Sequence, residues 1–399
     1  MIFLDNKDYI MWLSKSLYFN SKKVYYLLDI FGCAENVFNA ERKELSDLKT
    51  LKSENIDLMF KNKDKIPLWK SDLDRIGAEY ITFEEEKYPQ KLKNMYSPPV
   101  GIYVKGKLIE EKIPSVAIIG SRRCTAYGSE TAKMFSRELS EKGVCIISGM
   151  AAGIDSVANQ VALKTGGYTV AVLGFGFNFC YPYENRKLMD DIAEKGCLIS
   201  EYSPDTKPEV YYFPRRNELI AALSDVVVIV EAGKKSGALI TADAACQYGR
   251  EVMAVPSNIT SLNGKGVNEL IRDGCAVALE TEDIIFSLKN ISYNFEENIG
   301  NERQKDYKPR GENAKKEQSE KQTGIAKEEN LSKIKKTAVE LGLTSFAEEI
   351  YNLLGFEPVS TDYIAAKTKF SAAEIQSGLA MLEIYGIIEK LPGDRFVIK

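Results

Sequence analysis

Four glycine-rich segments could hold an anion, because each follows a short apolar run and opens an amphipathic one. They are GSRRCTAYG (120–128), SGMAAGID (148–155), LGFGFNFCYPYENRKL (173–188) and EAGKKSGALITA (231–242). A turn of small residues at a helix start offers backbone N–H groups and the positive end of the helix dipole. In the first segment, Arg122 adds a planar fork that suits phosphate, next to the turn at Gly120 and Ser121. That segment matches neither the dinucleotide-binding nor the Walker pattern, so neither an NAD site nor a Walker NTPase site is indicated. The alternative to an anion site is a tight strand–helix turn with surface arginines.

The next two segments carry weaker signals. Gly149 and Gly153 flank a turn that could cradle an anion or could simply let a helix and a strand pack closely. In the third segment, Asn185 and Arg186 could reach a phosphate, and aromatic side chains such as Tyr183 could stack on bases. The alternative for these aromatic residues is a cluster that packs a loop.

Two cation-bearing helix starts complete the set. Arg215, Arg216 and Asn217 lie in FPRRN, where arginines oppose the helix dipole, which favours an anionic ligand. The alternative is that the arginines pair with Glu201 or Glu218. The last segment contributes a further candidate helix start, for which a solvated loop is the alternative; its candidate residues are Lys234, Lys235, Ser236 and Gly237.

The elements that would position these loops alternate between short apolar runs and amphipathic stretches. The expected strands are SVAIIG, VCIIS, TVAVLG, CLISEY, DVVVIVEA and EVMAVPS, and the expected helices lie near 126–142, 153–164, 184–194, 216–223, 237–247 and 266–272. Nearly continuous apolar strands between helices predict a parallel sheet covered on both faces, which is a Rossmann-like three-layer α/β domain. In such a sheet ligands bind beyond the carboxyl ends of the strands, where all the loops named above would meet. Residues 115–287 hold 17 basic and 21 acidic side chains, so the positive charge must be concentrated in those loops.

The flanking regions have a different character. Residues 1–105 show helical spacing and end in a connecting segment, residues 106–290 form the α/β domain, and residues 291–340 are charged, with few bulky apolar side chains. Such a composition predicts a disordered linker. Residues 341–399 predict three helices and a hairpin that turns at Pro392, Gly393 and Asp394, which is the winged-helix plan.

Composition excludes several classes of function. The 399 residues include no histidine, which removes Ser-His-Asp and Cys-His nucleophiles and histidine-ligated zinc sites. The net charge of −4 provides no global field that attracts polyanions, and the seven cysteines include no C-x-x-C pair, which is typical of reduced thiols. We expect no signal peptide and no membrane span, since no apolar run reaches about 18 residues.

In this order and spacing, the motifs resemble the DNA-processing protein A family, also called DprA or Smf. They are GSRRCTAYG, SGMAAGID, YPYENRKL, FPRRNELIAALS, EAGKKSGALITA, GREVMAVPS and GVNELIRDG. The resemblance implies a helical SAM-like domain before the Rossmann-like domain and a winged helix after it. It also implies a cytoplasmic, non-catalytic protein without cofactor or metal, which binds single-stranded DNA, protects it during natural transformation and loads the RecA recombinase. Members form homodimers through the Rossmann-like domain.

By this resemblance, Gly120, Ser121 and Arg122 hold a backbone phosphate, and the FPRRN residues line the same groove. The expected nucleic-acid site comprises Gly120, Ser121, Arg122, Arg123, Gly149, Gly153, Tyr183, Asn185, Arg186, Arg215, Arg216, Asn217, Lys234, Lys235, Ser236 and Gly237. The chain departs from the family at three positions. It has Ala152 where many relatives have a basic residue, Asn159 where many have a histidine, and Tyr183 where some have a lysine. Whether Tyr183 and Arg186 replace the usual cation stays open.

The predicted recognition helix, SAAEIQSGLAMLEIY (371–385), contains Glu374 and Glu383 and neither lysine nor arginine. Residues 345–399 hold eight acidic and five basic side chains. Because DNA contacts normally come from basic and amide groups, this helix favours a protein contact or a regulatory role over DNA reading.

Two alternatives remain open. A nucleotide-binding sensor or a nucleoside-monophosphate hydrolase of a related Rossmann-like family would use a carboxylate such as Glu231 or Glu201. A transcription regulator with a winged-helix output is the third possibility, which the acidic recognition helix disfavours.

Overall fold

The computed structural model falls into two units. It describes residues 4–48, 50–290, 350, 359–368, 370–384, 388–391 and 395–398. The described residues through Asn290 belong to the first unit, and those from Ile350 onward belong to the second. The predicted disordered linker lies outside the described residues, as do the predicted hairpin turn and, except for Ile350, the first predicted winged-helix helix.

The first unit begins with a helical bundle. Its helices are α1 (Asn6–Ser16), α2 (Ser21–Phe31), α3 (Ala34–Asn39), α4 (Arg42–Asp47), α5 (Ser53–Asn62) and α6 (Ile66–Ile76). Asp5 starts α1 through a capping box with Asp8, and Gly32 ends α2 with a φ of +81° that a side chain would disfavour. The buried Trp12 ring donates its N–H to the Met59 carbonyl at 2.9 Å, which ties α1 to α5.

Next comes a nine-stranded sheet with the order β1-β2-β6-β5-β4-β3-β7-β8-β9. Its strands are β1 (Ala78–Thr82), β2 (Gly101–Gly106), β3 (Ser115–Gly120), β4 (Cys145–Ser148), β5 (Thr169–Leu173), β6 (Cys197–Ser200), β7 (Val226–Glu231), β8 (Glu251–Ala254) and β9 (Ala276–Val277). The strands from β3 to β9 pair in parallel, whereas β1 and β2 are antiparallel to their neighbours.

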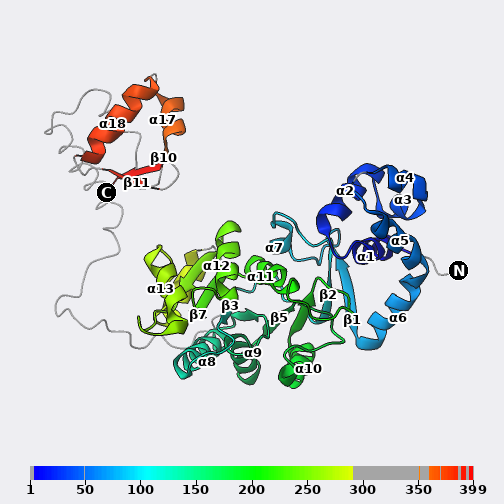
Figure 1. Ribbon diagram of the computed structural model, residues 1–399. Coiled ribbons are helices and arrows are strands. Elements are labelled where there is room, and N and C mark those ends of the chain that lie inside the picture. The colour runs from blue at the N-terminus through cyan, green and yellow to red at the C-terminus, as the bar shows by residue number, and fades with distance from the viewer. Residues whose placement is uncertain are drawn as a thin grey trace. The chain divides into compact units, whose positions relative to one another are not determined.

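Helices cover both faces of this sheet (Figure 1). One face carries α8 (Ala126–Glu141), α9 (Ile154–Lys164), α10 (Arg186–Lys195) and α14 (Thr281–Asn290). The other carries α7 (Gln90–Lys93), α11 (Tyr212–Leu223), α12 (Gly237–Gln247) and α13 (Lys265–Arg272). Alternate residues of β5 show the division, since Val170 and Val172 join one core and Ala171 and Leu173 join the other. The predicted three-layer α/β fold is therefore confirmed.

The segment before residue 105 requires one correction. We placed it with the helical domain, but β1 and β2 belong to the sheet, because Tyr103 of β2 pairs with Ser200 of β6. The ring of Tyr103 is also buried in the core that the helical bundle shares with the sheet. The bundle is thus packed on the sheet through a common core.

The order of the strands creates a switch point. From β3 the chain builds the sheet outward through β4, β5 and β6, and it then returns to place β7 on the other side of β3. In doubly wound sheets the loops diverge at such a point and leave a crevice at the carboxyl ends of the strands. The crevice between β3 and β7 is where the predicted anion-binding loops should meet.

The second unit contains β10 (Val359–Ser360), α17 (Thr361–Lys367), α18 (Ala372–Ile384), β11 (Ile388–Leu391) and β12 (Arg395–Ile398). Its three strands form an antiparallel sheet in the order β10-β12-β11, and Ile364, Leu379 and Phe396 are buried in its core. The two helices and the β11–β12 pair match the predicted winged helix. Among the described residues of both units, no helix is long and apolar enough to cross a membrane.

Candidate nucleic-acid interface

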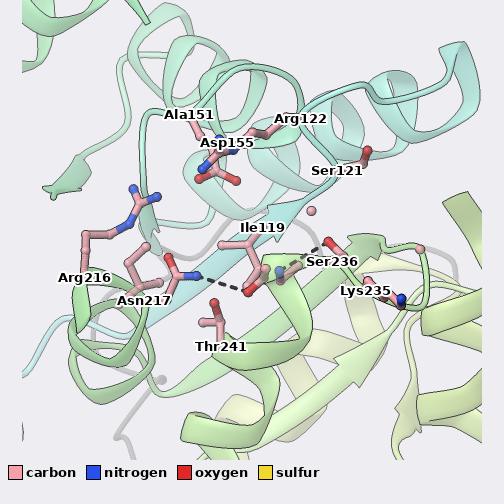
Figure 2. A pocket seen from close by; sticks show the side chains of 15 residues that line it. Ile119, Ser121, Arg122, Ala151, Asp155, Arg216, Asn217, Lys235, Ser236 and Thr241 are labelled. Atoms are coloured by element: carbon pink, nitrogen blue, oxygen red, sulfur yellow. Dashed lines mark hydrogen bonds between the residues drawn. The ribbon is translucent and has the colours of Figure 1, made fainter. Parts of the chain in front are cut away.

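A pocket of about 420 Å³ lies at the switch point, between the loops that follow β3 and β7. Its lining residues are Ile119, Gly120, Ser121, Arg122, Ala151, Asp155, Arg216, Asn217, Ile220, Gly233, Lys235, Ser236, Gly237, Ala238 and Thr241. Figure 2 shows Arg122 and Asp155 on one side, Arg216 and Asn217 on a second, and Lys235 and Ser236 on a third. We call this cavity the switch-point pocket.

The β3 side of the pocket depends on a close backbone approach. Gly153 has a φ of +81°, and a Cβ atom there would lie 2.3 Å from the Ser121 carbonyl oxygen. The Ile154 amide donates to that same oxygen at 3.3 Å. Glycine at position 153 therefore allows the start of α9 to support the turn that carries Arg122.

Asp155 connects the ends of two strands, β3 and β4, at the pocket. Its buried carboxylate accepts a hydrogen bond from the Gly149 amide at 3.2 Å, and the amides of Gly120 and Ala151 also donate to it. Burial raises the pKa of Asp155, and Arg216 together with the three amides opposes that shift. The aspartate thus organises the backbone of the turns that face the pocket.

Arg216 is a buried cation in the pocket wall, with only 4% of its surface exposed. Its Nη1 donates to the Val172 carbonyl at 3.1 Å and to the Gly149 carbonyl, and burial lowers its pKa. Within the part of the chain that the structure describes, its Nε has no hydrogen-bond partner. That Nε is itself buried, so Arg216 favours an anion in the pocket through its charge.

The β7 side of the pocket is formed by the start of α12. Ser236 caps this helix by accepting a hydrogen bond from the Ala238 amide at 3.3 Å, and the exposed Lys235 precedes it. The Asn217 amide donates to the Gly237 carbonyl at 3.1 Å and so links α11 to this helix start. The pocket therefore has cations on opposite walls and a helix N-terminus between them.

Half of the predicted site residues line this pocket. They are Gly120, Ser121, Arg122, Arg216, Asn217, Lys235, Ser236 and Gly237. Gly149 and Gly153 lie directly behind it, against Arg216 and Ser121 respectively.

Arg215 lies elsewhere, because consecutive helical residues point about 100° apart. Its guanidinium bonds both oxygens of the buried Glu201 at 2.8 and 3.2 Å, Glu218 at 2.8 Å and the Ser97 carbonyl at 2.7 Å. These carboxylates raise the pKa of Arg215 against the effect of burial. The sequence left open that Arg215 pairs with Glu201 or Glu218, and the structure contains both pairs.

Two other predicted cations also lie outside the pocket lining. Lys234 pairs with Glu269 at 2.7 Å, and the Arg123 side chain is exposed while its carbonyl accepts from Asn263 at 2.7 Å. Their neighbours Lys235 and Arg122 do line the pocket. In each of these adjacent pairs, therefore, one side chain lines the pocket and the other does not.

The predicted site residues in the loop after β5 lie away from the switch-point pocket. Asn185 donates to the Met150 carbonyl at 2.9 Å and lines a groove between α9 and α10. Tyr183 is 78% exposed in the short 3-10 helix η2 (Tyr183–Asn185), and Arg186 is the first residue of α10. None of the three is in the pocket lining that the described residues form.

The two carboxylates of the hydrolase alternative are already engaged. The buried Glu231 accepts hydrogen bonds from the Thr125 amide at 2.9 Å and from the Thr125 hydroxyl, which holds the start of α8. Glu201 is occupied by Arg215. Neither carboxylate lines the pocket.

Asn159 is a core residue. It is fully buried between α9 and β5, where its amide donates to the Thr169 hydroxyl at 2.8 Å and to the Val170 carbonyl at 3.4 Å. Asn159 therefore lies outside the pocket lining. Asp155 and Thr241 also line the pocket, although the sequence predicts no site role for either residue. The role of Asp155 in holding the turns follows from its burial and its amide partners.

We expect Gly153→Ala to lower the free energy of unfolding by about 3 kcal/mol or more, because the methyl group meets backbone oxygen in a strained conformation. It should also displace the turn that carries Arg122. Gly166→Ala is the matched control: its φ is +74°, but a Cβ there meets open space, so it should cost only about 1 kcal/mol. Urea denaturation of the two variants checks this, and equal losses would contradict the proposed role of the contact.

Two family models match the chain. Residues 79–289 match DNA recombination-mediator protein A, and residues 335–394 match the DprA winged helix domain. The first match begins at β1, consistent with the nine-stranded sheet.

Individual relatives are similar to the chain over much of its length. Protein Smf of Synechocystis sp. is 33% identical over 332 residues, which cover 80% of both chains. The DNA processing protein DprA of Bacillus subtilis is 38% identical over 54% of this chain and 74% of its own. The X-ray structure of DNA processing protein A from Streptococcus pneumoniae has a TM-score of 0.61 and 30% identity, and the match covers 71% of this chain and 98% of that one. The chain therefore belongs to the DNA recombination-mediator protein A family, the DprA/Smf family that its loop motifs predicted.

Proposed function

We propose that this protein binds single-stranded DNA through the switch-point pocket, and that it protects DNA taken up in natural transformation and loads RecA onto it. The observation that carries the binding proposal is the convergence of Arg122, Lys235 and the buried Arg216 on one pocket at the start of α12. A DNA phosphate in the pocket would be neutralised by these cations. Family membership supports the role as a recombination mediator.

The binding mode follows from the size and the chemistry of the pocket. A cavity of about 420 Å³ accepts one phosphate with part of its nucleotide, whereas a duplex presents its phosphates on a stiff, wide surface. The cations of the lining, Arg122, Arg216 and Lys235, suit the charge of the backbone, so contacts with phosphate dominate. We infer weak sequence preference and a preference for single strands.

We further propose that the protein acts without catalysis or a cofactor, in the cytoplasm, as a homodimer through the α/β domain. Glu231 and Glu201 are committed to Thr125 and Arg215, which argues against the hydrolase alternative. On α18 both Glu374 and Glu383 are exposed, which supports a protein-contact or regulatory role for the winged helix.

Fluorescence anisotropy with labelled oligonucleotides of equal length tests the function. We expect tighter binding of single strands than of duplexes, with log affinity falling by about 0.7 per log unit of salt for each phosphate that is neutralised. Turnover or micromolar binding of free nucleoside monophosphates, without affinity for oligonucleotides, would instead support the nucleotide-enzyme alternative.

A further inference from the structure

Three tyrosine rings are exposed on the first unit, which also holds the switch-point pocket. Tyr18 at the end of α1 is 61% exposed, Tyr211 just before α11 is 68% exposed, and Tyr181 after β5 is 46% exposed. We call these three residues the tyrosine strip. They come from three distant segments of the chain, including the helical bundle.

A row of ring contacts connects Tyr211 to the helical bundle. The Tyr211 ring lies 4.5 Å from that of Tyr212, which lies 4.0 Å from Tyr202. Tyr202 in turn meets Phe19 edge-on at 5.3 Å. Burial raises the pKa of Tyr212, and Tyr18 is near enough to contribute to that shift. The bundle and the start of α11 therefore share one aromatic surface.

Phe213, which follows Tyr212 in α11, links the Tyr181 ring to the switch-point pocket. Its ring centre lies 5.3 Å from the Arg122 guanidinium carbon and 5.7 Å from that of Arg216. On its other side it lies 5.7 Å from the Tyr181 ring. A nucleic-acid strand held at Arg122 would thus pass directly onto aromatic rings.

Backbone strain marks the same region. Tyr18, Phe19 and Met150 have φ values of 54°, 57° and 53°, and they are the non-glycine residues with positive φ in the described part of the chain. Met150 lies in the loop after β4, next to the pocket-lining Ala151. The left-handed conformation is unfavourable for residues with a branched or bulky side chain. Such strain clusters at functional sites.

Phe19 and Tyr18 differ in what offsets this strain. The Phe19 ring packs on Tyr202, whereas the Tyr18 ring is largely exposed. Asparagine adopts this backbone conformation more readily than tyrosine does. Stability alone therefore does not explain an exposed tyrosine at position 18.

We propose that the tyrosine strip stacks on unpaired bases of the strand whose phosphate occupies the switch-point pocket. This inference rests on the proposed function and extends it to a second contact surface, partly contributed by the helical bundle. Aromatic faces bind every base, so the strip adds affinity with little sequence preference. A protein segment is disfavoured as the occupant, because Tyr181 of the strip lies against Phe213, whose ring contacts Arg122 of the cation-lined pocket.

Anisotropy with two oligonucleotides of equal length tests the proposal: oligo-dT and a strand in which most bases are replaced by abasic sites. We expect Tyr18→Asn and Tyr211→Ala each to weaken dT binding about fivefold, and the double variant to weaken it further. Affinity for the abasic strand and the salt dependence should stay as in wild type. Tyr18→Phe should keep dT affinity, and Tyr18→Asn should denature at the wild-type temperature or above it. Tyr26→Ala, a tyrosine that is 38% exposed on α2, is the control that should leave binding unchanged.

The outcomes separate this proposal from the proposed function. If wild type binds oligo-dT and Arg122→Ala reduces that binding while both tyrosine variants keep it, the strip is wrong and the pocket stands. If the tyrosine variants lose affinity equally for the abasic strand, the rings do not act on bases, and the proposal is overturned. If wild type binds neither strand, the proposed function itself fails.

Discussion

Replacing Arg122 by alanine is expected to weaken single-stranded DNA binding about 10- to 100-fold, the range for losing a charge-assisted hydrogen bond to a phosphate. Arg122 lines the switch-point pocket next to the turn at Gly120 and Ser121. The slope of log affinity against log salt should fall by about 0.7, because one phosphate is no longer neutralised. Anisotropy at several salt concentrations measures both effects.

The sequence itself supplies a matched control. Arg123 is the same residue type one position later, is exposed, and lies outside the pocket lining. Arg123→Ala removes the same net charge, so it should change affinity less than about threefold, the size of a general field effect. Equal losses in the two variants would show that only the overall charge matters, and the pocket assignment would be wrong.

Arg122→Lys distinguishes charge from geometry. A lysine keeps the point charge but loses the planar fork and the contact with the Phe213 ring. We expect it to recover the salt slope but only part of the affinity. Full recovery would mean that the fork contributes nothing.

The sequence predicted the α/β core well because its signals are local. β3 and α12 lie where the apolar runs and the small-residue turns placed them, at Ser115–Gly120 and Gly237–Gln247. The sequence does not place β1 and β2 in the sheet, because β2 joins it by antiparallel pairing with β6, more than 90 residues later, and β1 joins it only through β2. No local pattern reports a pairing that distant.

The site was predictable as a set of loops but not as a set of side chains. Arg122 and Arg123, Arg215 and Arg216, and Lys234 and Lys235 are adjacent pairs, and in each pair one member lines the pocket. Which member does so depends on side-chain direction and on partners such as Glu201 and Glu269, which tertiary packing brings near. The role of Asp155 was hidden for the same reason, since its amide partners come from the ends of different strands.

Arg215→Met is expected to lower the free energy of unfolding by about 3 kcal/mol, because it leaves the carboxylate of Glu201 buried without its cation. The Arg215 side chain is 22% exposed. It also donates hydrogen bonds to Glu218 and to the Ser97 carbonyl. The second change, Glu201→Gln, removes the charge that would be left behind. The double variant should therefore be more stable than the sum of the single losses predicts, with a coupling energy of about 1–3 kcal/mol in urea denaturation.

The same variants decide whether Arg215 touches DNA. If its guanidinium only holds the start of α11 in place, Arg215→Met lowers DNA affinity through a displaced Arg216, and the salt slope stays as in wild type. Glu201→Gln should then weaken binding in the same way, although it makes the protein less negative, which by itself would favour binding a polyanion. A slope reduced by about 0.7 in Arg215→Met, together with tighter binding in Glu201→Gln, would instead make Arg215 a phosphate contact. Because Arg215 and Arg216 are neighbours in one motif, this comparison separates the residue that binds from the residue that positions it.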